Sequence, residues 1–227
     1  AKASFKDQAV IFKRKHNWLM CWLYIGTFGS FIGFAAGFAL LTKQVFPAID
    51  PTKLAFLGPL VGALMRVVGG WLSDKFPASK VTQASFIIMI LAVIGVMIFL
   101  PQNGQGGSFI GFFASFMLLF AATGIGNAST FAQAPRIFSA LHRHHAKVFG
   151  LSEAEADNNA AKESAAVVGF MGAVGAYGGF FIPKSFGTSI DLTGSAMMAL
   201  ICFILFYCYC IAINWWFYAR KNAEVKC

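Results

Sequence analysis

Residues 58–76 read GPLVGALMRVVGGWLSDKF, and this stretch decides the fold. From Leu54 to Leu72 the chain carries a single charged side chain, that of Arg66. A hydrocarbon core about 30 Å thick needs roughly 20 predominantly apolar residues of helix. The stretch therefore predicts a membrane-spanning helix with a permanent cation inside it.

The whole chain has the composition of an integral membrane protein. Its 227 residues are 58% hydrophobic and 12% charged, and the mean hydropathy is +0.67. These values are too apolar for a soluble domain of this length. We predict an all-α membrane protein with six transmembrane helices, over residues 18–41, 54–72, 81–100, 108–132, 165–182 and 193–218.

The distribution of basic residues predicts the orientation of the spans. Fourteen lysines and arginines lie on the side of the two termini and of the long loop 135–163, and three lie on the other side. The positive-inside rule then places both termini and this loop in the cytoplasm. We expect a cytoplasmic segment over 1–16, a six-helix bundle over 17–220 and a cytoplasmic tail over 221–227.

The net charge of +9 is accounted for by this orientation and by attraction to anionic membrane lipid. We therefore expect membrane lipid as a partner and no nucleic acid. The chain opens on polar and basic residues without an initiator methionine, so we expect residue 1 to lie within a longer protein.

Arg66 needs an explanation, because an ionised side chain at the centre of a membrane helix costs roughly 2.5–3.5 kcal/mol. It lies six residues before the predicted inner end of its span, or about 9 Å, which is far for the side chain to reach the interface. All nine acidic residues fall in predicted loops, termini or span ends. We predict that Arg66 faces an internal cavity and binds an anion through its planar, five-donor guanidinium.

Two further patterns leave alternatives open. Gly169, Gly172, Gly175 and Gly178 are spaced three apart in the fifth predicted span. Such a strip allows either tight helix packing or close approach of a ligand together with helix bending. Tyr24 and Phe28 are four apart and share a helix face, which is either lipid-facing, part of the core or the wall of a pocket.

Other chemistries find little support in the sequence. The five cysteines have no metal or disulfide spacing, and the four histidines lie in predicted loops or at a span end, so we expect no metal, no cofactor and no enzyme. His142 and His145 have a helical ligand spacing, but a solvated basic segment explains them better. We read residues 152–164 as an exposed acidic loop that re-enters a helix near Glu163, with Ser152 as a helix N-cap and Glu155 three residues later.

Two stretches carry a resemblance to a known family. RVVGGWLSDKF (66–76) and VGFMGAVGAYGGFFIPKSFG (168–187) resemble the nitrate/nitrite porters of the major facilitator superfamily, and the likeness extends over the whole chain. The first contains a form of the superfamily's loop motif, with Pro77 where a glycine is expected. The second is similar to the nitrate signature of helix eleven. The resemblance implies the carboxy-terminal half, helices seven to twelve, of a twelve-helix fold.

The resemblance also implies roles for particular residues. Arg66 would be one of two arginines that clamp the anion, its mate lying in helix two of the amino-terminal six-helix half of the same protein. Tyr24 and Phe28 would line the pocket from helix seven, and Gly169 and Gly172 would face the substrate. Helix bending would fall to Gly175 and Gly178, and the cytoplasmic gate to Asp74 and Lys75.

The implied activity is nitrate and nitrite transport across the cytoplasmic (inner) membrane of a bacterium by alternating access. A proton relay normally uses an intramembrane acid or histidine, and the predicted spans lack an acid, so we favour nitrate/nitrite exchange. Nitrate/proton symport and transport of another small anion stay open, and a non-transporting membrane scaffold is a more distant alternative that leaves Arg66 unexplained.

Overall fold

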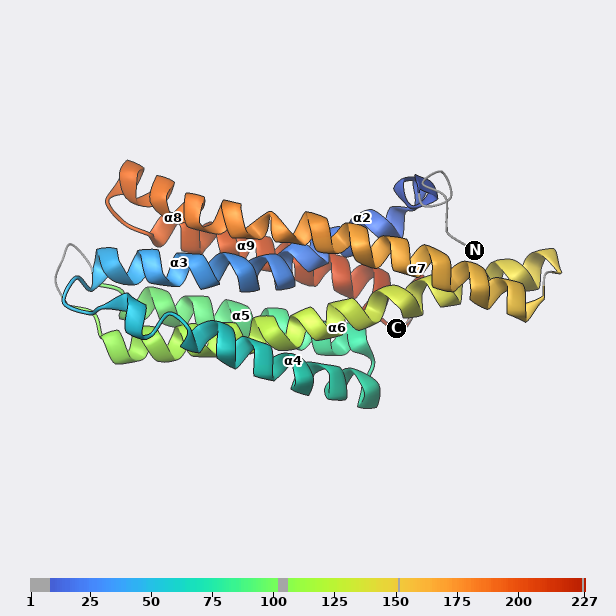
Figure 1. Cartoon of the computed structure of the whole chain (residues 1–227), viewed down its shortest axis with the longest axis horizontal. Helices are drawn as coiled ribbons and strands as arrows, with labels where there is room; N and C mark the ends of the chain where they lie inside the picture. Colours follow the sequence, from blue (N-terminus) through green and yellow to red (C-terminus); the bar gives the residue numbers. More distant parts are fainter. Residues whose placement is uncertain (1–8, 102–105, 151, 226) are drawn as a thin grey trace.

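The computed structural model describes residues 9–101, 106–150, 152–225 and 227, which are helical for most of their length and form one elongated bundle (Figure 1). Within this part of the chain, six helical runs are long and apolar enough to cross a membrane: Lys15–Val45, Pro51–Lys75, Ala78–Phe99, Phe109–Phe149, Glu153–Thr193 and Met197–Ala219. The prediction of six spans in an all-α fold is confirmed. Residues 1–8 of the predicted segment 1–16 lie outside the described residues.

The first span is interrupted by a π-helical segment. A short 3-10 helix, η1 (Ala9–Lys13), precedes α2 (Lys15–Tyr24), and the π-helix η2 (Ile25–Gly29) connects α2 to α3 (Ser30–Val45). The chain packs tightly here, because a Cβ added at Gly26 would come within 2.8 Å of the Phe86 ring. Single π turns inside α-helices are rare and often mark functional sites.

The second span packs closely on the fourth. Asp50 caps the 3-10 helix η3 (Pro51–Lys53), because its carboxylate accepts from the backbone N–H of Thr52 at 3.0 Å. The helix α4 (Leu57–Lys75) follows. A Cβ added at Gly124 of α6 (Phe109–Phe149) would overlap the carbonyl of Gly62 of α4. The glycines of α4 thus allow close helix approach. The third span, α5 (Ala78–Phe99), packs along the same long helix.

The prediction of a loop over 135–163 was wrong for most of that segment. α6 (Phe109–Phe149) continues past Pro135, and α7 begins at Glu153, so the turn between them is centred on Gly150 at φ 71°. The Ser152 hydroxyl accepts from the backbone N–H of Glu155 at 3.2 Å, which confirms the predicted N-cap. Hydropathy ends a span where charges begin, but a helix continues until its backbone is capped. The resulting hairpin of α6 and α7 extends beyond the rest of the bundle (Figure 1).

The fifth span also differs from its predicted length. It consists of α7 (Glu153–Ala176) and α8 (Gly178–Thr193), which are separated only at Tyr177. The predicted end at residue 182 was wrong, because α8 passes through Pro183 and continues for ten more residues. Proline is tolerated in membrane helices, where neighbouring helices and local adjustments satisfy the freed backbone groups. Lys184, expected in an outer loop, therefore lies inside a helix.

The described ends of the chain meet at one end of the bundle. The sixth span comprises α9 (Met197–Asn214) and the π-helix η4 (Trp215–Ala219). Beyond it, the Glu224 carboxylate accepts from Lys15 Nζ at 2.5 Å, next to the start of the first span. Because the chain runs along the bundle an even number of times, both described ends lie on the same side.

The core lies between the first and fourth spans and positions the remaining helices. Phe34 and Phe38 of α3 are fully buried against Phe112, Phe116 and Phe120 of α6, with ring centroids 5.1–6.5 Å apart. Aromatic clusters of this kind bury large areas in fixed geometry. In Figure 1, α4 lies on one side of this core and the α7–α8 pair on the other. Those two spans are the least buried of the six, because only 17% and 28% of their most apolar stretches lie inside the bundle.

Candidate anion-binding site

Arg66 occupies the midpoint of α4. The helix extends to Lys75, three residues further than predicted, so Arg66 is about 13 Å of helix from either end. Its side chain is exposed, and it makes no hydrogen bond or ion pair with any residue that the structure describes. Gly62 and Gly69, on the buried face of α4, pack against α6. The Arg66 side chain is therefore even further from the membrane interface than the sequence alone indicated.

Tyr24 and Phe28 form a stacked aromatic pair beside this arginine. Their ring centroids are 5.0 Å apart with an interplanar angle of 25°, which confirms that they share a face. Tyr24, the last residue of α2, is buried, and Phe28 in the π segment is half-buried. The second span packs beside the first here, because a Cβ added at Gly62 of α4 would overlap the Phe31 ring of α3.

The glycines of the fifth span divide into two pairs. A Cβ added at Gly175 would lie 3.0 Å from the rings of both Tyr24 and Phe28, and one at Gly178 would overlap the backbone of Gly29. Gly169 and Gly172 have nothing described within 4 Å of an added Cβ. Gly175 and Gly178 thus pack against the first span near the interruption at Tyr177. Gly169 and Gly172 leave bare backbone open on α7.

Asp74 and Lys75 lie at the end of α4, two turns from Arg66. Asp74 is exposed and pairs with Arg136 Nη2 of α6 at 3.4 Å, and Lys75 Nζ lies 4.1 Å from the centroid of the Trp71 ring. Both contacts are on the surface at the end of the bundle where the described chain ends meet. They are separate from the group formed by Arg66, Tyr24 and Phe28.

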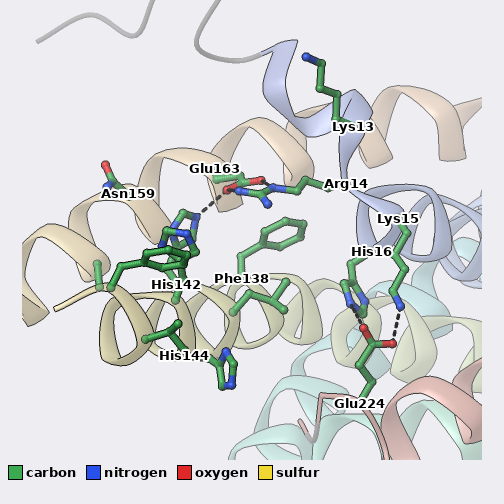
Figure 2. A pocket seen from close by; sticks show the side chains of 15 residues that line it. Lys13, Arg14, Lys15, His16, Phe138, His142, His144, Asn159, Glu163 and Glu224 are labelled. Carbon is green, nitrogen blue, oxygen red and sulfur yellow. Dashed lines mark hydrogen bonds and ion pairs between the residues drawn. The ribbon is translucent and has the colours of Figure 1, made fainter. Parts of the chain in front are cut away.

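A cavity of about 640 Å³ lies at this same end of the bundle (Figure 2). Glu163 accepts from Arg14 Nε at 2.7 Å and pairs with His142 Nε2 at 2.6 Å. A second carboxylate, Glu224, pairs with Lys15 and His16. The hydrogen bond from Lys15 lowers the pKa of the Glu224 carboxyl, more than its partial burial raises it. Ion pairs connect several of the residues that line this cavity, and Arg66 is not one of the lining residues.

The described residues contain no group of three or more histidine, cysteine, aspartate and glutamate side chains placed to hold a metal ion. His142, which the sequence offered as a ligand together with His145, is instead paired with Glu163. The His145 ring packs against the Phe149 ring in a tilted arrangement, with centroids 4.3 Å apart. The histidine run thus contributes to packing and ion pairing in the α6–α7 hairpin.

Sequence reasoning missed two features of this region. The π segment was invisible, because the residues 25–29 have an ordinary apolar helical pattern; only the glycines at 26 and 29 hinted at unusual packing. The position of Lys184 was missed because Pro183 was taken as a helix end. Both depend on tertiary contacts that hydropathy does not register.

The six spans define a helical membrane protein, and the Arg66 side chain at mid-span has no partner among the described residues. Comparison with known proteins agrees. The chain is 44% identical over its whole length to the nitrate/nitrite transporter NarU of Escherichia coli and 46% identical over 99% of its length to NarU of Salmonella typhimurium. It is 36% identical over its whole length to the "Probable nitrate/nitrite antiporter NarK2" of Thermus thermophilus. No protein-family model matches.

Along its full length the chain is thus similar to proteins named as nitrate/nitrite transporters. It spans about half the length of the curated relatives it matches, covering 47–49% of each. The relatives are named as transporters, which agrees with the absence of enzymatic chemistry expected from the sequence.

Proposed function

We propose that this chain is the carboxy-terminal six-helix half of a transporter that exchanges nitrate and nitrite across the cytoplasmic membrane of a bacterium. Support comes from the full-length match to half of each named relative and from the six spans. The partner is the amino-terminal six-helix half of the same protein. Residues 1–16 form the central cytoplasmic loop, 17–220 the membrane bundle and 221–227 the cytoplasmic tail. The basic residues at this end orient it toward the cytoplasm.

Arg66 binds the anion in this proposal, and its unpaired position at the midpoint of α4 is the observation that carries it. A cation exposed at this depth needs a counterion, and the described spans offer it none. The substrate anion is then the counterion, held together with a second arginine from the other half. Tyr24 and Phe28 form the wall beside it, and the bare backbone at Gly169 and Gly172 allows close approach from the fifth span.

The transport cycle is alternating access, in which one half moves against the other around a fixed site. Two like-charged arginines facing each other oppose closure, and a bound anion offsets that repulsion. Gly175 and Gly178 flank the break at Tyr177 and permit bending there. Asp74 and Lys75 act at the cytoplasmic gate, where Asp74 contacts Arg136 across α4 and α6.

Exchange is favoured over proton symport because the acids of the described residues lie toward the ends of their spans or outside them, away from the level of Arg66. A proton relay at the site needs an ionisable group there. The naming of one relative as a nitrate/nitrite antiporter points the same way. Proton coupling through the other half and transport of another small anion are the outcomes to test against.

The test is uptake by the full-length protein in liposomes. Nitrate uptake that requires internal nitrite and does not respond to a pH gradient supports exchange. Uptake driven by the gradient without nitrite contradicts exchange and indicates symport. Arg66→Lys keeps the charge but loses the bidentate fork, so we expect uptake to fall at least 100-fold, with Lys147→Arg as the matched surface control. Absence of nitrate uptake by the unmodified protein under every condition would overturn the assignment.

A further inference from the structure

Lys184 is a cation in the interior of a membrane-spanning helix, and the described residues offer it no acidic partner. It is exposed in the interior of α8 (Gly178–Thr193) and makes no hydrogen bond or ion pair with the described residues. The acidic residue of the same helix, Asp191, lies seven residues further toward its end, or about 10 Å along the axis. Among the residues that the structure describes, Lys184 and Arg66 therefore both lack an acidic partner.

The side of the fifth span on which Lys184 lies is defined by its neighbours. Residues spaced three or four apart follow one line along α7 and α8 and are all exposed: Gly169, Ala173, Ala176, Phe180 and Lys184. The opposite side is buried, and Gly178, Ile182 and Phe186 pack there against Gly29, Gly33 and Gly37 of the first span. Lys184 is thus at the far end of the open stripe that begins at Gly169.

The charge of Lys184 indicates whether this stripe faces lipid or a water-filled path. An ammonium group facing lipid inside the hydrocarbon core carries a penalty of a few kcal/mol, whereas one facing a water-filled path does not. α8 continues for nine residues beyond Lys184, about 13 Å, so the side chain is well inside the helix. Its stripe also belongs to one of the two least buried spans, the other being the one that carries Arg66.

We propose that Lys184 lines the outer part of the anion pathway, between the level of Arg66 and the end of the bundle opposite the described chain ends. There it attracts the anion toward Arg66 by its charge, without belonging to the group that clamps it. The inference rests on the proposed function for the identity of the anion. It assigns a positioning role to a residue that the sequence had placed in a loop.

The first test measures access to water, so it does not depend on transport. In the full-length protein with its own cysteines replaced, Lys184→Cys is treated in liposomes with a charged, membrane-impermeant thiol reagent. Variants that restore only Cys202 or Cys208, which are exposed on α9, give the rate for the other outer surface of the bundle. We expect the Lys184→Cys variant to react at least 10-fold faster than these two, and nitrate to slow the reaction. Equal rates would overturn the proposal.

The second test measures attraction of the anion. Lys184→Gln is expected to raise the KM for nitrate about 3- to 10-fold at low ionic strength, and the difference should shrink as salt is added, because charge steering is screened. Lys184→Arg keeps the charge and should restore the KM. Lys43→Gln, an exposed lysine near the end of α3, is the matched control and should change little. An unchanged KM in Lys184→Gln at low salt would contradict the role.

The two tests separate failure of this inference from failure of the proposed function. If the unmodified protein takes up no nitrate, the proposed function is wrong, while the labelling rates still decide whether Lys184 faces water. If uptake occurs and labelling of the Lys184→Cys variant matches that of the α9 cysteines, the function stands and this inference is wrong.

Discussion

The cations of α4 and α8 contrast with those at the end of the bundle where the chain ends meet. At that end Arg14, Lys15, Arg136 and Arg143 each contact a carboxylate of the same chain at 2.5–3.4 Å. Away from that end, Arg66 at the midpoint of α4 and Lys184 in the interior of α8 contact no carboxylate among the described residues. A cation with its own acid has a structural explanation, whereas one without an acid at membrane depth calls for a water-filled path or a counterion from outside the described chain.

The largest effect that this contrast predicts is on anion binding by Arg66. Arg66→Gln removes the charge from an exposed position, so the fold should be kept while nitrate loses its partner. Nitrate should raise the melting temperature of the unmodified full-length protein in detergent and should leave that of the variant unchanged. Equal stabilisation by nitrate in both proteins would mean that the anion binds elsewhere.

A paired cation should give the opposite result, a change in stability. The Glu163 carboxylate is 9% exposed and serves both Arg14 and His142. Glu163→Gln leaves those groups without a counter-charge, so the free energy of unfolding should fall by roughly 1–3 kcal/mol. The readout is the thermal denaturation midpoint. Glu155→Gln, whose carboxylate contacts only the Ser152 hydroxyl among the described residues, is the control, and an equal midpoint in the two variants would contradict the prediction.

Asp74→Asn separates a gate from a structural pair. Asp74 is 82% exposed and 3.4 Å from Arg136, so losing this pair should cost less than about 0.5 kcal/mol of stability. If Asp74 acts at the gate, nitrate uptake should nevertheless slow several-fold. Unchanged uptake and unchanged stability together would remove Asp74 from the gate.

The smallest expected effect is a pH dependence at the tail. The hydrogen bond from Lys15 lowers the pKa of Glu224, so this contact stabilises the fold above the unfolded-state pKa of about 4.3 and is lost as the pH falls through the lower, folded-state value. The side chain is 43% exposed, so the contribution is a few tenths of a kcal/mol. Melting curves between pH 7 and pH 3 should decline slightly less for Glu224→Gln than for the unmodified protein; identical slopes would mean that the pair contributes nothing.

Hydropathy was sufficient to predict the number, order and approximate position of the spans, because each contains an apolar run near membrane length. It was insufficient for the α6–α7 hairpin, where good helix formers such as Ala160 and Lys162 continue the helix into a charged region. It also ended the fifth span at Pro183, although neighbouring helices support the chain beyond it. Helix periodicity correctly paired Tyr24 with Phe28, but the approach of Arg66 to Tyr24 depends on how two spans pack and has no signal in either stretch alone.

The contact between Gly29 and Gly178 has a consequence for how this protein can vary. A Cβ added at Gly178 would overlap the Gly29 backbone, and one added at Gly29 would come within 3.0 Å of the Gly175 carbonyl oxygen. A larger residue at either place would force the first and fifth spans apart and would draw Gly175 away from Tyr24 and Phe28. Mutations in relatives or in the laboratory that alter the shape of the aromatic wall can therefore arise at two positions that have no side chain and touch no anion.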